Sequence, residues 1–462
     1  MPTMIRRLAT RLSTLTSRDA GKGAGTRGAQ QPPPPSDRLA TLAHAFREHG
    51  DVIPFRGARL FAHPDAVRDI LITHDRSFTK SPALRKARFT LGNGLLTNEG
   101  ETYRRQRALV QPSLHPKSLS GYAEIMTRHA ADAARGWRDG EAIEVHREMM
   151  RLTLRIVGEA LFGTSVGPEV DQISRAMDLN VGMFRLLTSP WGRLKVLLPT
   201  PYFFRFLLAR RRLVGTLRRI INERRDERRD ERRASGGAVR DDLLARLLKA
   251  REGEVGMTET QLVDECVTLF AAGHETTANA LTFTLWLLAR HPAVTDRLYA
   301  EVRAVCPDDR LPTIGDLDAL PYARMVVAES MRLYPPAWIV GRQAKEPVEI
   351  GGVRLKRGAV VFISQWITQR DGRWWPDPER FDPERFSPEP QGARPRWSYF
   401  PFGGGSRQCV GEAFAWAEAV LALAVLVRRW RFEPVDDAPL RLEPGITLRP
   451  AGEVRIVPRA QH

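Results

Sequence analysis

The chain has 462 residues, of which 42% are hydrophobic and 27% charged, so it can bury an extensive core as globular proteins do. Its three cysteines, Cys266, Cys306 and Cys409, form no C-x-x-C pair, which excludes a structural zinc site and a four-cysteine iron–sulfur cluster. The net charge of +17 suits an acidic partner or a membrane surface, but no DNA- or RNA-binding signature accompanies it, so we expect no nucleic-acid partner.

The first 35 residues differ in composition from the rest of the chain. Met4, Ile5, Leu8, Leu12 and Leu15 recur at helical spacing with arginines between them. This pattern fits a short interfacial helix with peripheral membrane contact, a targeting peptide, or a frayed basic tail, and we favour the tail. The following Gly/Gln/Pro stretch is typical of a linker. We therefore predict a basic, disordered extension over residues 1–35 and one domain over residues 36–462.

From Ser36 onward the patterns predict one mixed domain that is mainly α-helical with small β-sheets. A short helix leads into strands, then a turn at His63-Pro64 and another helix, and residues 76–100 resemble a loop. Alternating short strands follow Pro336, a loop-rich stretch spans 371–407, and short strands end the chain. Helical periodicity is found at 101–111, 118–137, 144–162, 169–187, 202–233, 240–250, 258–290, 292–305, 321–333 and 410–429. No run of about 20 apolar residues suggests a membrane span.

The longest helical pattern, residues 258–290, carries a polar group at its centre. Thr258 and Gln261 have the spacing of a capping box, and Pro292 ends the pattern. Gly273 weakens the helix in its middle, where a threonine hydroxyl can donate to the carbonyl four residues back. Together they can open a local groove in the helix. A lone histidine such as His274 is more often a packed residue than a ligand, and we assign it no catalytic role.

The stretch FGGGSRQCVG places Cys409 between a glycine-rich loop and a buried helix that is apolar over 413–427 except for Glu418. We expect the N-terminus of that helix and Arg407 to favour a thiolate. The neighbouring glycines, among them Gly403 and Gly411, let backbone approach a flat partner closely. This environment suits an iron ligand better than a hydrolytic nucleophile, which would need a histidine base that is distant in sequence. A buried structural cysteine is the plain alternative.

The cysteine stretch resembles the haem-binding signature F-x-x-G-x-R-x-C-x-G of the cytochrome P450 family. Phe402, Gly405, Arg407, Cys409 and Gly411 match it. The resemblance implies the cytochrome P450 fold as a single large haem domain. It further implies haem b (iron protoporphyrin IX) as cofactor, with Cys409 as the axial thiolate and Phe402, Gly403, Arg407 and Gly411 around it.

Three further stretches match the family in the expected order. Residues 272–277, AGHETT, resemble A/G-G-x-D/E-T-T/S, which implies that Thr276 and Glu275 form an alcohol–acid pair that supplies protons for oxygen activation. Glu329 and Arg332 match E-x-x-R. Arg385 of FDPERF matches the PERF element, although DPERF at 377–381 is a second copy. By resemblance these last three residues form a buried charge network that fixes the cysteine loop.

The remaining stretch, residues 103–107, predicts contacts to the haem propionates. The family usually has W-x-x-x-R, and this chain has Tyr103 and Arg107 at those positions. Tyrosine can also donate a hydrogen bond, so we expect its role to persist. Arg342 matches the arginine that follows the Glu329 helix. The resemblance therefore implies that Arg107, Arg342 and Arg407 bind the propionates through charge-assisted hydrogen bonds.

The implied activity is a monooxygenase that inserts one oxygen atom from O2 into a lipophilic substrate by hydroxylation or epoxidation. RLYPPAWIV with TQRD loosely resembles carotenoid-hydroxylating members, and terpenoids and fatty acids are comparable candidates. No reductase segment is attached, so we expect a separate ferredoxin with its reductase, or a flavodoxin, steered by Arg104 and Arg105. We expect a cytoplasmic monomer, since an odd cysteine count without a secretory signal favours a reducing compartment. A peroxide-driven peroxygenase, a non-catalytic haem sensor and a thiol hydrolase are the alternatives.

Overall fold

The computed structural model describes residues 37–163, 200–233, 243–251, 257–308, 310–388 and 394–461, with a few single positions between 173 and 187. The chain divides into a short unit that ends at His44 and a main unit from Ala45 to His462. The predicted extension over residues 1–35 and most of the helix predicted at 169–187 lie outside the described residues. The account below concerns the main unit.

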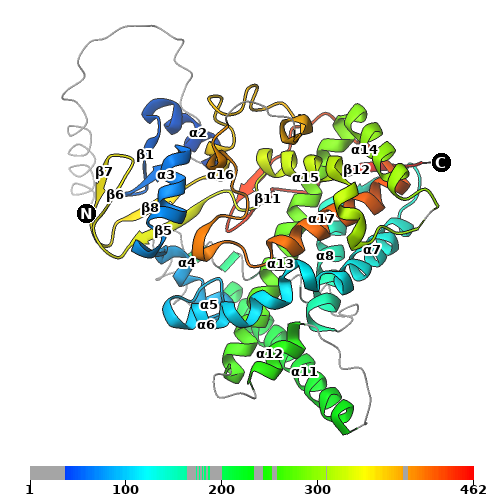
Figure 1. The fold of residues 1–462 in the computed structure, drawn as a ribbon, viewed down its shortest axis with the longest axis horizontal. Helices are drawn as coiled ribbons and strands as arrows, with labels where there is room; N and C mark the ends of the chain where they lie inside the picture. Colours follow the sequence, from blue (N-terminus) through cyan, green and yellow to red (C-terminus); the bar gives the residue numbers. More distant parts are fainter. Residues whose placement is uncertain are drawn as a thin grey trace. The chain divides into compact units, whose positions relative to one another are not determined.

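Helices form most of the described chain, as the sequence predicts (Figure 1). Those longer than eight residues are α2 (Arg38–His49), α6 (Gly100–Val110), α7 (Ser120–Arg135), α8 (Val145–Phe162), α11 (Pro201–Arg233), α12 (Leu243–Arg251), α13 (Glu259–Arg290), α14 (Pro292–Val305), α15 (Pro321–Leu333) and α17 (Glu412–Arg429). Shorter ones are α3 (Pro64–Arg68), α4 (Pro82–Lys86), α5 (Arg88–Leu91) and α16 (Gln365–Thr368).

The described strands form four small sheets. The largest has the order β1-β2-β8-β5-β3, from β1 (Val52–Phe55), β2 (Ala58–Phe61), β8 (Val360–Ile363), β5 (Val340–Ala344) and β3 (Phe78–Lys80). A second has the order β4-β12-β9, from β4 (Ile143–Glu144), β12 (Arg455–Ala460) and β9 (Trp430–Pro434). Two hairpins complete the set, β6 (Val348–Ile350) with β7 (Val353–Leu355), and β10 (Leu442–Pro444) with β11 (Leu448–Pro450). The predicted class, mainly α with small β-sheets, is confirmed.

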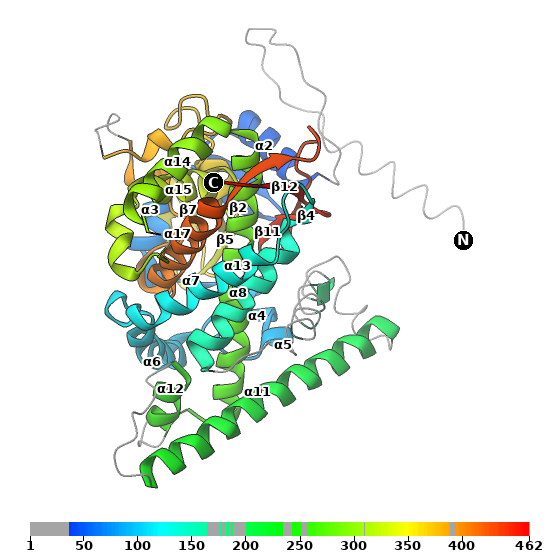
Figure 2. The ribbon, with the colours of Figure 1, turned by 90° about the vertical axis from the view of Figure 1, so that its right-hand side faces the viewer.

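Helix α13 runs through the main unit and packs against α8, α15 and α17 (Figure 2). Its N-terminus has the predicted capping box, in which Thr258 and Gln261 each bond the other's backbone. Most of its side chains are buried, which explains its apolar sequence. At Gly273 a β-carbon would lie 3.0 Å from Val157 of α8, so this glycine permits the close approach of the two helices. The helix continues through Gly273 without a break.

Two local predictions were wrong. Residues 76–100 are not a continuous loop, because they contain β3, α4 and α5. These elements are too short to show a hydrophobic period, and β3 is fixed only by pairing with the distant strand β5. Helix α17 begins at Glu412 with Gly411 as its N-cap, not at Val410, so a turn separates Cys409 from the helix.

Candidate functional site

The cysteine loop, residues 402–411, is held in shape by its backbone and by two glycines. The Cys409 amide donates to the Phe402 carbonyl at 3.0 Å, which closes the loop on itself. Gly403 and Gly405 have φ values of +70° and +69°, a region that favours glycine. A β-carbon on Gly405 would lie 2.0 Å from the Leu71 carbonyl oxygen, so no other residue fits this close approach. The loop is therefore built on its glycines.

Cys409 is exposed, yet burial raises the pKa of its thiol. The exposed surface and the raised pKa are compatible, because a residue can have accessible surface on one side while protein packs densely around the rest of it. The Gly411 amide and Arg107 lower the pKa in part, while Glu412 raises it further. The Gly411 amide at the N-terminus of α17 thus favours the thiolate as expected, but burial outweighs it, and Arg407 is not among the groups that shift this pKa.

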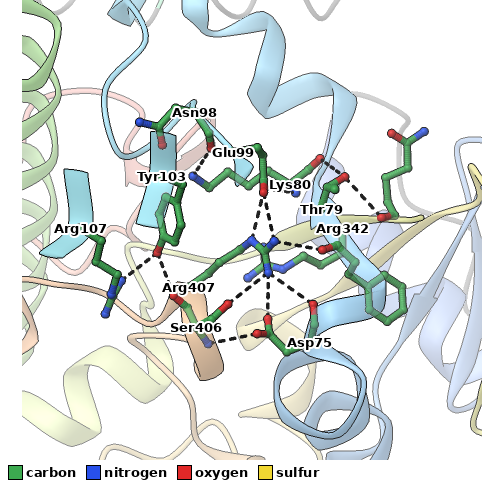
Figure 3. Close-up of polar contacts among 12 residues, drawn as sticks. Asp75, Thr79, Lys80, Asn98, Glu99, Tyr103, Arg107, Arg342, Ser406 and Arg407 are labelled. Carbon is green, nitrogen blue, oxygen red and sulfur yellow. Dashed lines mark hydrogen bonds and ion pairs between the residues drawn. The ribbon is translucent and has the colours of Figure 1, made fainter. Parts of the chain in front are cut away.

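Arg407 binds two carboxylates (Figure 3). Its guanidinium lies 2.9 Å from Asp75 Oδ1 and 3.0 Å from Glu99 Oε2, and it also donates to the Phe78 carbonyl at 3.0 Å. Burial acts to lower its pKa, but the hydrogen bond and charge of Glu99 prevail and the pKa is raised. Arg407 thus ties the cysteine loop to the segments that contain Asp75 and Glu99.

Tyr103 and Arg107 lie one turn apart on α6 and contact the same loop (Figure 3). The Tyr103 hydroxyl donates to the Ser406 carbonyl at 2.9 Å, and Arg107 donates to the Tyr103 hydroxyl at 2.9 Å and to the Gln408 carbonyl at 2.7 Å. A phenol has one hydrogen to donate. In this arrangement that hydrogen is used within the protein, and Arg107 is the member of the pair with further donors.

Arg342 and Lys80 are neighbours across the β3–β5 pair, and both are buried. The Arg342 Nε has no hydrogen-bond partner among the described residues, and burial, followed by the nearby charge of Arg407, lowers its pKa to about 10. Lys80 Nζ donates to the Leu95 and Asn98 carbonyls at 2.6 and 2.7 Å, and burial lowers its pKa to about 7. Sequence reasoning missed Lys80, because only the strand register brings it beside Arg342.

The segment that holds Lys80 is itself fixed to α13. The Asn93 amide donates to Asp264 at 2.8 Å, and the Leu95 amide donates to Glu265 at 3.0 Å. Burial raises the pKa of Glu265 to about 8, and the amide of Leu95 only partly offsets this. Two adjacent acids of α13 therefore position the carbonyls that bind the Lys80 ammonium.

The predicted alcohol–acid pair on α13 points in two directions. Thr276 Oγ1 donates to the Ala272 carbonyl at 2.7 Å, which is the predicted bond to the carbonyl four residues back. Ala272 is exposed and Thr276 partly exposed, whereas most of this helix is buried. Glu275 Oε1 instead accepts a hydrogen bond of 2.6 Å from Thr447, close to β11. Consecutive residues of a helix do not face each other, so the two side chains do not meet.

His274 is fully buried against α8. Its Nδ1 lies 2.8 Å from the Phe270 carbonyl, and its own carbonyl accepts a hydrogen bond of 2.9 Å from Thr153. Phe270 also stacks on Phe162 of α8, with ring centroids 4.3 Å apart. These contacts make His274 part of the α8–α13 packing.

The Glu329 network consists of Glu329, Arg332 and Arg385. Arg332 binds Glu329 with both Nε and Nη2, at 2.7 and 2.8 Å, and both side chains are fully buried. Arg385 Nε lies 3.4 Å from Glu329 Oε1. Arg380, from the second DPERF copy, contributes its carbonyl to Arg332 at 3.2 Å. The network includes the side chain of Arg385 and only the backbone of Arg380.

Comparison with known proteins agrees with this arrangement. The family model "Cytochrome P450" matches residues 54–455. The chain belongs to the cytochrome P450 family. Among its relatives, cyclooctatin synthase of Streptomyces melanosporofaciens is 38% identical over 89% of either chain, and pentalenene oxygenase of Streptomyces avermitilis is 36% identical over 85% of this chain and 86% of its own. Protein LUTEIN DEFICIENT 5, chloroplastic, of Arabidopsis thaliana is 32% identical over 84% of this chain and 68% of its own.

Proteins of the P450 family bind haem through a cysteine thiolate and act as monooxygenases. The described residues fit that cofactor in two ways. Cys409 is exposed near the end of a loop in which two glycines adopt positive φ values. Beside the loop lies a group that we call the cation cluster: Lys80, Arg107, Arg342 and Arg407, with the acids Asp75 and Glu99. The cations outnumber the acids, and one buried guanidinium nitrogen lacks a partner, as a site for two carboxylates requires.

Proposed function

We propose that this P450 monooxygenase hydroxylates a terpenoid, with Cys409 as the axial ligand of its haem. The observation that carries the assignment of the site is the exposed Cys409 beside a cation cluster in which Arg342 Nε lacks a hydrogen-bond partner among the described residues. When bound, haem supplies the activation of dioxygen and the transfer of one oxygen atom to the substrate.

The cation cluster would hold the propionates. Arg342 has a buried Nε without a partner among the described residues, and Arg107 has N–H groups beyond those that bind Tyr103, Gln408 and Gln111. Lys80 completes the group, since an added carboxylate would favour its charged form, which burial disfavours. Arg407 would contribute mainly by fixing the loop, because Asp75 and Glu99 already bind it.

Thr276 would act on the opposite side of the haem. Its hydroxyl donates to the Ala272 carbonyl and so lies where the side of α13 is accessible. From there it can accept or donate a proton to a reacting molecule. Glu275, in its bond to Thr447, is held apart from this side and would supply protons indirectly.

The substrate class rests on relatives and on the lining of α13. Two of the relatives reported above carry names that refer to cyclooctatin and pentalenene, and we infer a terpenoid for this chain too. Ala271 and Ala272 at the accessible part of α13 are small and apolar, which suits a bulky hydrocarbon. Carotenoids and fatty acids are the competing substrates.

We propose a separate ferredoxin with its reductase, or a flavodoxin, as electron donor. Arg104 is exposed on α6, the helix that contacts the cysteine loop, whereas Arg105 is only partly exposed. Arg324 is also exposed and stacks 4.1 Å from the ring centroid of Trp416, which packs against Phe402. An acidic carrier would be attracted to these cations.

The proposal is tested with purified enzyme, haem and a panel of terpenes, carotenoids and fatty acids. We expect terpenes to shift the haem spectrum and to be hydroxylated when a ferredoxin, its reductase and NAD(P)H are added. Cys409→Ser should abolish the absorbance band of the reduced carbon monoxide complex that marks thiolate ligation, and a retained band would refute the ligand. Equal turnover with peroxide alone would favour the peroxygenase alternative.

Among the described helices, none is both long and apolar enough to cross a membrane.

A further inference from the structure

The Glu275 carboxylate is bound by a residue that is distant in the sequence. It accepts the Thr447 hydroxyl at 2.6 Å, and both side chains are more than nine-tenths buried. Thr447 immediately precedes β11, so Glu275 points toward the β10–β11 hairpin. A carboxylate in that position needs a source of protons on the same side of the helix if it is to supply any.

His146 is the titratable side chain that the structure places there. It is the second residue of α8, it is partly exposed, and its Nε2 lies 3.0 Å from Asn279 Oδ1. Asn279 is four residues after Glu275 on α13, and positions four apart share one face of a helix. Because an amide oxygen only accepts, the Nε2 atom carries a hydrogen, and Nδ1 is left to gain or lose a proton.

The charges around His146 come from each neighbouring element. Glu144 of β4, Arg449 of β11 and Glu275 of α13 all act on it through space. Burial lowers the pKa of His146, Arg449 lowers it further, and Glu144, the Asn279 bond and Glu275 raise it. Glu144 also accepts the Val454 and Arg147 amides, and Arg449 binds Glu443 at 2.9 Å.

We propose that His146 is a relay residue that passes protons from solvent to Glu275 for the monooxygenase reaction. Its ring is partly exposed, and its Nε2 contacts Asn279 on the face of α13 that also carries the buried Glu275. The inference rests on the proton-supplying role proposed above for Glu275. Insertion of one oxygen atom of O2, with release of the other as water, consumes two protons and two electrons, so each turnover requires two such transfers.

The transfer itself moves only a proton. The Nδ1–H bond of the His146 imidazolium breaks, and an O–H bond forms on the Glu275 carboxylate, directly or through a water molecule. Two opposite charges become two neutral groups, and solvent protonates Nδ1 again. Thr447 would then serve as a latch, because its hydrogen bond to an ionised carboxylate is stronger than to a neutral one. Once protonated, Glu275 is freer to leave Thr447.

The first experiment follows the His146 ring by nitrogen NMR during a pH titration of the haem-loaded, carbon monoxide-bound enzyme, with His146→Gln to assign the signal. We expect Glu275→Gln to lower the pKa of His146, because it removes a carboxylate that favours the imidazolium. His129, which binds Glu159 at 2.8 Å on another part of the chain, is the internal control and should not move. An unchanged His146 titration in Glu275→Gln would overturn the proposal, and this readout needs no substrate.

The second experiment measures the fraction of electrons lost to peroxide, with any compound that shifts the haem spectrum. His146→Gln keeps a donor for Asn279 but cannot carry a proton, so we expect peroxide release to rise roughly 10-fold, within the range of lost acid–base catalysis. In the wild-type enzyme, the fraction of electrons that ends in product should fall as pH rises through the pKa of His146. In His146→Gln, this fraction should show no such step. A matched His129→Gln control should behave as wild type.

The outcomes separate this inference from the proposed function. If His146→Gln keeps its thiolate spectrum and also the wild-type coupling and pH profile, the relay is refuted while the monooxygenase assignment stands. If the wild-type enzyme lacks the thiolate band, Cys409 is not the ligand. The shift of the His146 pKa in Glu275→Gln still decides whether the Glu275 carboxylate acts on His146.

Discussion

The Glu329 network and the cation cluster both bury arginines, but Arg332 of the first completes its bonds within the protein and Arg342 of the second does not. Arg332 uses every donor of its guanidinium, on Glu329 and on the carbonyls of Gln369, Pro378 and Arg380. In the cluster, Arg342 keeps an Nε without a partner among the described residues. A buried cation is costly unless it is paired. Arg332 is thus fully bonded within the folded protein, although Arg385 Nε of the same network has no hydrogen-bond partner among the described residues, whereas Arg342 lies beside other cations and keeps a donor for an added anion.

The largest effect should come from removing the Glu329 carboxylate that binds Arg332. Glu329→Gln leaves Arg332 buried without its carboxylate, and we expect it to cost about 3–5 kcal/mol in the free energy of unfolding. Chemical denaturation measures this, and loss of soluble protein is the extreme form of the same result. Glu384→Gln is the matched control, because Glu384 pairs with Arg297 on the surface and should change stability by less than about 1 kcal/mol. Equal effects of the two variants would contradict the comparison.

Removing the unpaired cation should instead affect the cofactor. Arg342→Leu deletes a buried charge that lacks a full set of partners, so we expect little loss of folding stability. Haem should dissociate roughly 10–100-fold faster, since a hydrogen bond to a charged group contributes about 1.5–3 kcal/mol. Transfer of haem to an excess of a haem scavenger measures the rate. Arg342→Lys keeps the charge and should lose less, and wild-type haem retention in Arg342→Leu would show that no propionate binds there.

Glu418 offers a third case, an acid buried in α17, where burial raises its pKa to about 8. Because the folded pKa lies above the unfolded one, the folded state holds the extra proton between about pH 4.5 and 8. Stability should therefore fall as pH rises through this window, by at most about 1.4 kcal/mol per pH unit. Glu418→Gln should flatten the slope of unfolding free energy against pH. A slope equal to that of wild type would mean that Glu418 is ionised in the folded protein.

The smallest effect should come from Tyr103. Tyr103→Phe removes the hydrogen bond to the Ser406 carbonyl and the acceptor for Arg107, and we expect a loss of about 1 kcal/mol in unfolding free energy. Haem retention should change little if Arg107, not Tyr103, contacts the propionate. Tyr103→Trp restores the residue that the family usually has at this position. A greater haem loss in Tyr103→Phe than in Arg107→Ala would reverse this assignment.

The sequence predicted features with a local signal. The capping box of α13 and the Thr276 bond to Ala272 both follow from spacings of three or four residues. The distant partners had no such signal. Lys80 meets Arg342 only through strand register, Arg407 meets Asp75 and Glu99 through the tertiary fold, and Glu275 finds Thr447 172 residues later.

The thiol pKa of Cys409 shows a different limit. The position of Cys409 beside a helix end and an arginine suggested a thiolate. The effect of burial on the thiol pKa is larger than that of the groups that lower it, so the pKa is raised. Desolvation depends on the density of surrounding chain, which no short motif records. The choice of Arg385 over the second DPERF copy relied on family spacing, and the ion pair with Glu329 agrees with it.

The close approach of Gly405 to the Leu71 carbonyl has a consequence for the order of assembly. The Ser406 amide also donates to Asp75, 331 residues earlier in the chain. During synthesis the N-terminal part emerges first and must wait for the last segment, because contacts this remote in sequence form late. Cofactor capture is therefore a closing event of folding, and a ribosome that stops short of the cysteine loop releases a chain that cannot hold haem at all.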